Sequence, residues 1–134
     1  MSASTPEELL YTPEHEWLLK KSETVVRIGI TEFAQDQLGD VVFVKLPDDD
    51  EEVTSGDSFA EVESTKSVSD IYAPLSGRVV AVNAGLDQAP QLINEDPYGE
   101  GWIVEIEAPS PDDLESALGE LLDADGYKAL ISGD

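Results

Sequence analysis

Two short patterns each occur twice in the chain, and this internal repeat constrains the fold more than any other feature. Gly39 to Val44 (GDVVFV) is echoed by Gly77 to Val82 (GRVVAV), and Phe59 to Glu63 (FAEVE) by Ile103 to Glu107 (IVEIE). Each half runs from a glycine-led apolar segment, through a loop, to an alternating segment that ends in acid. We therefore expect a mainly β, α+β fold: a flattened barrel or sandwich of two pseudo-symmetric halves.

Strand patterns fill the middle of the chain. The apolar run over residues 40–46 predicts a strand buried on both faces, whereas residues 102–108 alternate and place Trp102, Val104 and Ile106 inward. Val26, Ile28 and Ile30 share one face of a strand that forms a hairpin with the segment before it. In all, strands are predicted over residues 15–19, 24–30, 40–46, 60–63, 71–73, 78–83 and 102–108.

Helix signals mark one internal segment and the end of the chain. Thr31 is the expected N-cap of a short helix over residues 32–38, which Gly39 ends. A C-terminal helical segment is predicted over residues 110–131, where Ser110 is the N-cap and Pro111 the first helical residue. A last short helix covers residues 127–131. The apolar stripe of the longer helix consists of Leu114, Leu118, Leu121 and Leu122.

Size and charge limit the possible functions. The 134 residues predict a single domain, 1–134, with its core over residues 24–107. A net charge of −23 excludes nucleic acid and anionic membranes as natural partners, because both would be repelled. Acid is spread along the whole chain, which we interpret as adaptation to a halophilic cytoplasm; the alternative is a dedicated acidic binding surface. No cysteine, leader pattern or membrane-length apolar run is present, so we expect a cytoplasmic protein.

Lys66 is the candidate functional residue. It lies between Thr65 and Ser67 in a polar turn that joins two predicted strands, so its side chain should project into solvent. A surface lysine usually serves solubility alone. Here the hairpin setting, the junction between the half-repeats and the acidic flank favour a lysine that another enzyme acylates.

Other motifs offer little chemistry. His15 stands between two glutamates, but neighbours on a strand point to opposite faces and the chain has no second histidine, so no metal site is expected. The stretch from Gly99 to Gly101 lacks a following helix and a basic residue, so it is no phosphate loop. Lys20 and Lys21 are interpreted as ordinary surface, and no catalytic residue is assigned.

Four ordered segments of the chain resemble the H-protein family of the glycine cleavage system, which belongs to the biotinyl/lipoyl-domain superfamily. They cover almost all of residues 11–107: YTPEHEW (11–17), GITEFAQDQLGDVVFVKLP (29–47), VESTKSVSDIYAPLSGRVVAVN (62–83) and PQLINEDPYGEGW (90–102). The resemblance implies a hammerhead-type lipoyl-domain fold. A biotin carrier would place methionines beside its lysine, and Thr65 and Ser67 disfavour that cofactor.

The resemblance also implies a role. Lipoate would be attached to Lys66 by an amide, and the chain would be a carrier and no enzyme. The implied partners are a pyridoxal-phosphate glycine decarboxylase, a tetrahydrofolate-dependent aminomethyltransferase, dihydrolipoyl dehydrogenase, and the lipoate ligase or lipoyltransferase that loads the carrier. The carrier would move the aminomethyl group of glycine between the first two enzymes and electrons to the third, and we expect it to act as a monomer.

A loaded arm gains from a sheltering surface that is partly apolar and carries an anion for the amine. The candidate acids are Glu14, Glu16 and Asp70, and the stretch containing Asn94 and Tyr98 is a second candidate wall. Two other functions stay open from sequence. One is a relay that donates lipoate to 2-oxoacid dehydrogenases, and the other is an acidic β module whose lysine is never modified. The intact mass of the native protein would separate a carrier from an unmodified module.

Overall fold

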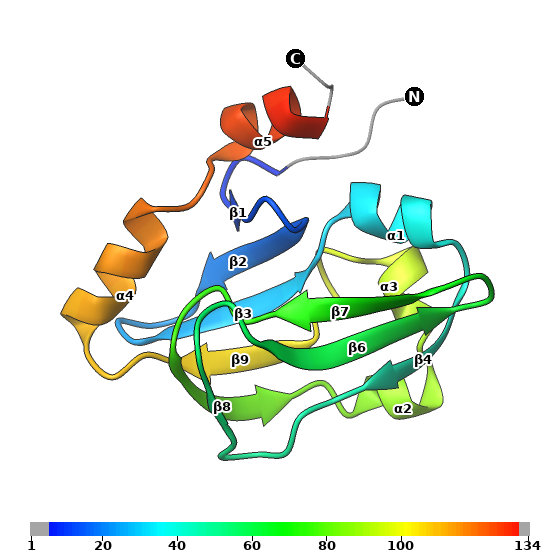
Figure 1. Cartoon of the computed structure of the whole chain (residues 1–134), viewed down its shortest axis with the longest axis horizontal. Coiled ribbons are helices and arrows are strands. Elements are labelled where there is room, and N and C mark those ends of the chain that lie inside the picture. The colour runs from blue at the N-terminus through cyan, green and yellow to red at the C-terminus, as the bar shows by residue number, and fades with distance from the viewer. Residues whose placement is uncertain (1–5, 132–134) are drawn as a thin grey trace.

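Nine strands form two antiparallel sheets in the computed structural model, which describes residues 6–131 (Figure 1). The expected single domain, residues 1–134, extends beyond the described residues at both ends. The larger sheet has six strands in the order β1-β2-β3-β9-β8-β5. Their bounds are β1 Leu10–Tyr11, β2 Glu16–Lys20, β3 Val25–Ile30, β5 Glu52–Val53, β8 Gly77–Val82 and β9 Val104–Glu107.

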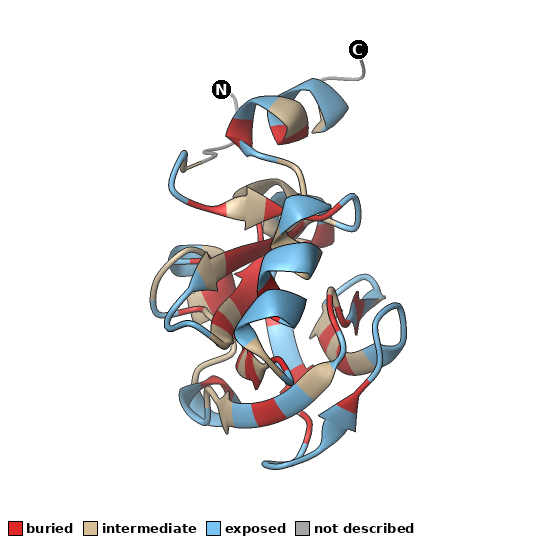
Figure 2. Ribbon diagram, turned by 90° about the vertical axis from the view of Figure 1, so that its left-hand side faces the viewer, coloured by how far each residue is buried: buried red, intermediate tan, exposed pale blue. Residues whose placement is uncertain are grey.

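The smaller sheet lies in front of the larger one in Figure 1 and has the order β4-β6-β7. Its strands are β4 Val41–Lys45, β6 Ser58–Ser64 and β7 Val68–Tyr72. Side chains from both sheets share one apolar core: Val44 and Ile71 of the small sheet belong to the same buried cluster as Ile28 and Ile106 of the large one. Figure 2 shows these buried residues alternating with exposed ones along the strands, as expected for strands with one covered face.

The internal repeat is confirmed as a structural repeat. In the first half β4 pairs with β6, and in the second half β8 pairs with β9 in the same antiparallel way. A β-bulge interrupts β4 between Val41 and Phe43, and another interrupts β8 between Val79 and Ala81, which are the equivalent positions of the repeat. The two sheets do not close on each other completely, so the fold is the expected flattened sandwich of two related halves.

The helices begin and end close to their predicted residues. Helix α1 covers Glu32–Leu38, with the Thr31 hydroxyl accepting a hydrogen bond from Ala34 N and Gly39 as C-cap. Helix α4 covers Pro111–Gly119, with the Ser110 hydroxyl accepting from Asp113 N at 3.1 Å. Two short helices, α2 Gly85–Gln88 and α3 Leu92–Glu95, fill the connection between β8 and β9, and α5 covers Ala124–Ile131.

A second, smaller apolar cluster ties the C-terminus to the first strands. Tyr11 and Tyr127 stack with ring centroids 4.6 Å apart, and the buried Trp17 lies in the same cluster. An isolated bridge between Tyr11 and Leu122 pairs the chain beyond α4 with β1. Helix α5 therefore belongs to the folded body through its packing on β1 and β2.

Four local predictions were wrong. Residues 40–46 are not buried on both faces: Val42 is 54% exposed and Phe43 49%, because β4 is an edge strand whose outer face is open and whose bulge rotates the side chains. His15 precedes β2 and has a positive φ of 70°. Trp102 lies before β9 and is half-buried under the Arg27 guanidinium, 4.4 Å from the ring centroid. Helix α4 ends at Gly119, so Leu121 and Leu122 pack on the body from outside that helix.

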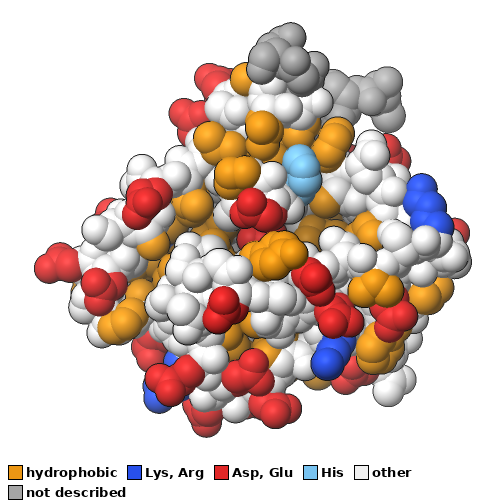
Figure 3. All heavy atoms as spheres, in the orientation of Figure 1, with side chains coloured by type: hydrophobic (Ala, Val, Ile, Leu, Met, Phe, Trp, Pro, Cys, Tyr) orange, Lys and Arg blue, Asp and Glu red, His pale blue; other side chains and the backbone are white. Residues whose placement is uncertain are grey.

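Acidic side chains are scattered over the face shown in Figure 3, with few basic groups among them. Within residues 6–131, Glu16 is the one buried acidic residue. No helix in this part of the chain has the length and apolar character needed to cross a membrane.

Candidate functional site

Lys66 stands in a tight turn at the tip of the β6–β7 hairpin, which projects from one end of the molecule in Figure 1. Ser64 organises this turn. Its backbone N–H donates to the carbonyl of Ser67 at 2.8 Å, and its hydroxyl accepts from the backbone N–H of Lys66 (3.3 Å) and of Ser67 (3.1 Å). The Lys66 side chain is exposed, as the sequence predicts. Ser64 was not among the predicted site residues, although a serine two residues before a turn lysine is the usual signal for such a bond.

The turn rests on the corner between α1 and β4. The backbone N–H of Thr65 donates to the carbonyl of Asp40 at 3.1 Å. Gly39 has a φ of +85°, and a Cβ atom on it would lie 3.3 Å from Cε of Lys66. The aliphatic stem of the lysine therefore passes close over a residue that has no side chain, a contact that sequence analysis missed because it assigned Gly39 only the end of α1.

Asn94 lies on the other side of this corner, on α3. Its Oδ1 accepts from Val41 N at 2.8 Å, and its Nδ2 donates to the carbonyl of Gly39 at 2.8 Å and to Oε1 of Gln35 at 2.9 Å. Both amide hydrogens are thus used within the fold. The structure places Asn94 against the support of the lysine turn instead of in an open cavity.

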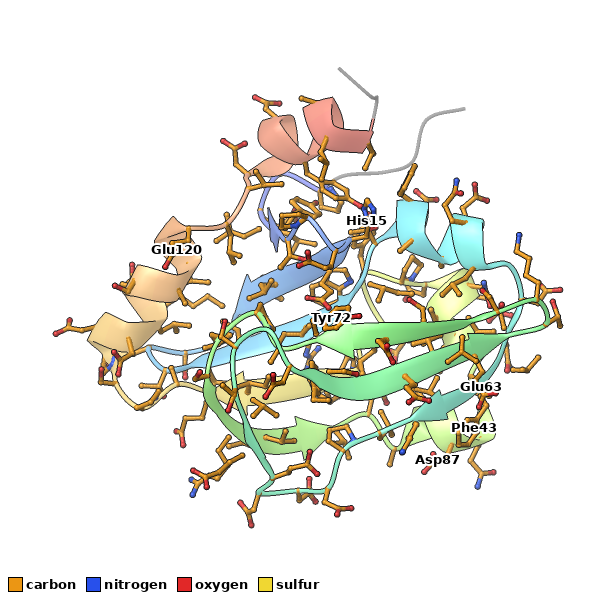
Figure 4. The ribbon with its side chains drawn as sticks, in the orientation of Figure 1. His15, Phe43, Glu63, Tyr72, Asp87 and Glu120 are labelled. Atoms are coloured by element: carbon orange, nitrogen blue, oxygen red, sulfur yellow. The ribbon has the colours of Figure 1, made fainter. Side chains whose placement is uncertain are left out.

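A cavity of about 410 Å³ runs along α1 and β7, from the residues that follow Lys66 to His15. Figure 4 shows His15 above the middle of β7, well away from the tip of the hairpin. Apolar side chains of α1 form one wall, and Glu14 lies at the end near His15. The lining residues are Glu14, His15, Ile30, Phe33, Ala34, Gln37, Leu38, Ser67, Val68, Ser69 and Ile71.

The loop before β2 holds the acidic end of this cavity in place. The Thr12 hydroxyl accepts from the backbone N–H of Glu14 and of Glu16, both at 3.2 Å. His15 Nδ1 lies 2.8 Å from the Tyr127 hydroxyl, which lies 2.7 Å from Oγ1 of Thr31. Burial lowers the pKa of His15 below its ordinary value, although the nearby Glu14 carboxylate opposes this. His15 is therefore neutral at neutral pH. Its contact with the Tyr127 hydroxyl attaches the loop to α5.

Glu16 is buried, with only 1% of its surface exposed. Its Oε2 accepts from the backbone N–H of Tyr72 at 2.7 Å, so the carboxyl group links β2 to the end of β7. Burial raises the pKa of Glu16 to about 8, against the hydrogen bonds from Tyr72 and Thr12, which lower it. Glu16 does not line this cavity: its hydrogen-bond partners Thr12 and Tyr72 line a second cavity, which Glu14 also borders.

The other two predicted residues lie elsewhere. Asp70 is exposed on β7, on the same face as Val68, but unlike Val68 it does not line the cavity. The Tyr98 hydroxyl accepts from the backbone N–H of Glu32 at 3.1 Å, at the start of α1, and its ring packs beside Trp17. The structure therefore places Glu14 at the cavity, buries Glu16 outside its lining, sets Asn94 under the lysine turn, and leaves Asp70 and Tyr98 outside the lining as well.

The geometry of the site suits the attachment of a group-carrying arm better than catalysis by the chain's own side chains. One exposed amine stands at a rigid tip, an apolar-walled cavity begins beside it, and a carboxylate lies at the far end. In residues 6–131, no three acidic or histidine side chains gather closely enough to hold a metal ion.

Comparison with known proteins gives a consistent result. The family model described as Glycine cleavage H-protein matches residues 9–133. The glycine cleavage system H protein of Mycobacterium sp. (strain KMS) is 59% identical over 127 residues, which cover 95% of this chain and 96% of that protein. The protein of the same name from Nocardia farcinica (strain IFM 10152) is 59% identical over 131 residues, which cover 98% and 99%. The crystal structure of a glycine cleavage system H protein from Mycobacterium marinum has a TM-score of 0.82 at 42% identity and covers 96% of this chain and 99% of that one.

Proposed function

This chain belongs to the glycine cleavage H-protein family, and we propose that it carries the lipoyl group of that family on Lys66. It is a carrier subunit and not a catalyst. It moves the aminomethyl group of glycine from glycine decarboxylase to the tetrahydrofolate-dependent aminomethyltransferase, and electrons to dihydrolipoyl dehydrogenase. The observation that supports Lys66 most directly is its position at an exposed, hydrogen-bonded turn beside an apolar-walled cavity.

The residues of the site fit a lipoyl group. An amide to Nζ of Lys66 removes the charge of the lysine and leaves a long, mostly apolar arm, whose sulfur atoms supply the redox and group-transfer chemistry when it is bound. The cavity begins at Ser67 and Val68, next to the attachment point, so an arm on Lys66 can enter it directly. Phe33 and Leu38 offer apolar contact along the way.

We propose that Glu14 and Glu16 face the amine of the carried group at the far end of the cavity. Glu14 lines that end, and Glu16 follows it by two residues, with its carboxyl group buried against Tyr72. An amine that leaves bulk water needs a nearby anion, which these carboxyl groups provide. Asp70, Asn94 and Tyr98 stay candidates on sequence grounds, while the positions of Glu14 and Glu16 favour those two.

The finer assignments follow as proposals. The carrier core is residues 24–107, and the chain works in the cytoplasm as a monomer. Its partners are the pyridoxal-phosphate glycine decarboxylase, the aminomethyltransferase, dihydrolipoyl dehydrogenase and a lipoate ligase or lipoyltransferase. The thirty acidic residues, spread along the whole chain, support the proposal that the protein is adapted to a salt-rich cytoplasm.

Intact mass spectrometry tests the attachment site. Purified protein is incubated with lipoate, ATP and a lipoate ligase, and the parent should gain the mass of one lipoyl group. Lys66→Arg should gain none, whereas Lys45→Arg, which changes an exposed lysine on β4, should be modified like the parent. A lipoyl adduct on Lys66→Arg would refute the assignment.

A further inference from the structure

We propose that Asn94 positions Lys66 for modification, although it touches neither the lysine nor the cavity. This inference rests on the proposed attachment of lipoate to Lys66. Asn94 belongs to α3 in the second half of the molecule, and the lysine turn belongs to the first half. The two are connected through the backbone of three residues, Gly39 to Val41.

The Asn94 side-chain amide hydrogen-bonds to the backbone of residues 39–41 from one side. It donates to the carbonyl of Gly39 and accepts from the N–H of Val41, both at 2.8 Å, so it bonds the groups on either side of Asp40 as a neighbouring strand would. Gln35 Oε1 takes the remaining amide hydrogen at 2.9 Å. Only one orientation of the amide group satisfies all three hydrogen bonds, so these bonds fix its rotation.

The lysine turn rests on the same backbone from the other direction. The carbonyl of Asp40 accepts from the N–H of Thr65 at 3.1 Å, and Gly39 lies under the stem of Lys66. The turn is also closed by bonds from Ser64 to Lys66 and Ser67, and the strands leading into it are paired, β6 with β7 and Ser64 with Val41 of β4. The corner held by Asn94 is therefore one of the contacts that set where the lysine stands relative to the body of the protein.

An enzyme that acylates Lys66 must bring an activated carbonyl carbon to Nζ at a defined angle. A turn that moves with a loose corner spends less time in that orientation, so the reaction slows even though Lys66 is still exposed. Loss of Asn94 should reduce the rate of modification and leave the chemistry of the amine unchanged.

Asn83 provides a matched control. Its Nδ2 also donates to two backbone carbonyls, those of Glu100 and Trp102, both at 2.7 Å. None of these bonds reaches residues 39–41 or 64–67. Asn83→Ala should cost the fold a similar number of hydrogen bonds without loosening the corner under the lysine turn.

The experiment measures kcat and KM for lipoate-ligase modification of Asn94→Ala, Asn83→Ala and the parent, at a temperature where all three are folded. We expect kcat/KM to fall about tenfold for Asn94→Ala, because the lysine spends less time in the reactive orientation, and to stay within about twofold of the parent for Asn83→Ala. Hydrogen exchange of the Thr65 amide should become faster in Asn94→Ala only. Equal rates for Asn94→Ala and the parent would overturn the inference.

Two further variants keep the test decisive. Asn94→Asp retains the shape and the bond from Val41 but sets an oxygen against the Gly39 carbonyl, so it should also slow modification and serves if the alanine variant does not fold. Gln35→Ala removes one bond to Asn94 and should have a smaller effect. If the parent itself gains no lipoyl group, the proposed function has failed; if the parent is modified and the Asn94 variants match it, only this inference has failed.

Discussion

The stem of Lys66 passes over Gly39, so that a Cβ atom on the glycine would lie 3.3 Å from Cε of the lysine. Gly39 also has a backbone φ of +85°, which residues other than glycine rarely adopt. A substitution of Gly39 should therefore have two separate costs: backbone strain and displacement of the lysine stem.

Gly39→Ala should show both costs. Alanine in this positive-φ conformation, with a ψ of −159°, should lower the free energy of unfolding by about 1–3 kcal/mol, and the methyl group should shift Lys66 and slow its lipoylation. Gly56→Ala is the control, since Gly56 has a φ of +90° with no atom within 4 Å of its Cβ position. Urea unfolding should give similar losses for the two variants, and only Gly39→Ala should slow lipoylation. Slower lipoylation of both would show that backbone strain alone is responsible.

The buried Glu16 should make stability depend on pH. Its pKa is raised from 4.5 to about 8 in the folded protein, so between these values the folded state holds a proton that the unfolded state has released. The contribution of Glu16 to the free energy of unfolding is therefore largest below its unfolded-state pKa of 4.5. It falls by up to about 1.4 kcal/mol per pH unit as the pH rises towards the folded-state pKa of about 8.

Glu16→Gln keeps the shape of the side chain and cannot ionise. Urea unfolding of the parent and the variant from about pH 5 to about pH 9 should show a fall for the parent and a flatter profile for the variant. Parallel profiles would mean that Glu16 is ionised in the folded protein across this range.

The Tyr127 hydroxyl joins the cavity loop to α1, at 2.8 Å from His15 Nδ1 and 2.7 Å from Thr31 Oγ1. Tyr127→Phe leaves the half-buried His15 and the buried Thr31 short of one bond each and should cost about 1–3 kcal/mol of unfolding free energy. Tyr11→Phe, in the ring stacked on Tyr127, removes one bond to the Pro6 carbonyl and should cost less. Chemical denaturation compares the two; a larger loss for Tyr11→Phe would contradict the role given to the Tyr127 hydroxyl.

Retention of the carried group should depend on the acids at the cavity. Glu14→Gln and Glu16→Gln should release ammonia and formaldehyde about tenfold faster than the parent when tetrahydrofolate is absent, since a charged hydrogen bond to the amine is lost. Asp70→Asn, on the opposite face of β7, tests the remaining acidic candidate in the same assay. Parent-like retention by both glutamine variants would place the shelter elsewhere.

Salt should stabilise the protein. Thirty acidic residues against seven basic ones repel one another, and screening in molar salt shortens the reach of that repulsion to about 3 Å. The thermal midpoint should rise strongly from dilute buffer to molar salt, and sodium and potassium chloride should act alike because screening depends on ionic strength. A constant midpoint would contradict the salt-adaptation proposal.

Features encoded within a few residues could be predicted from the sequence. Thr31 and Gly39 bound α1 as expected, because an N-cap hydroxyl and a C-cap glycine act on their own helix ends. The exposed turn around Lys66 is equally local. The repeat also predicted a flattened sandwich of two related halves, since each copy of the pattern contains two strand-forming segments.

Features that depend on distant parts of the chain could not be predicted. The apolar run of β4 does not reveal that this strand is an edge with an open outer face. Glu16 is buried because β7 closes over it from 56 residues away. Asn94 looked like a cavity residue because nothing near it in sequence indicates that its amide partners are Gln35, Gly39 and Val41.

The matching bulges of β4 and β8 mark two halves that contribute different parts of the site. The first half presents the lysine, while the second carries the α2–α3 connection, whose Asn94 holds the corner under the lysine turn. A chain cut between the halves, before Gly77, would separate Lys66 from Asn94, and the two fragments would have to reassociate before the lysine regained its support.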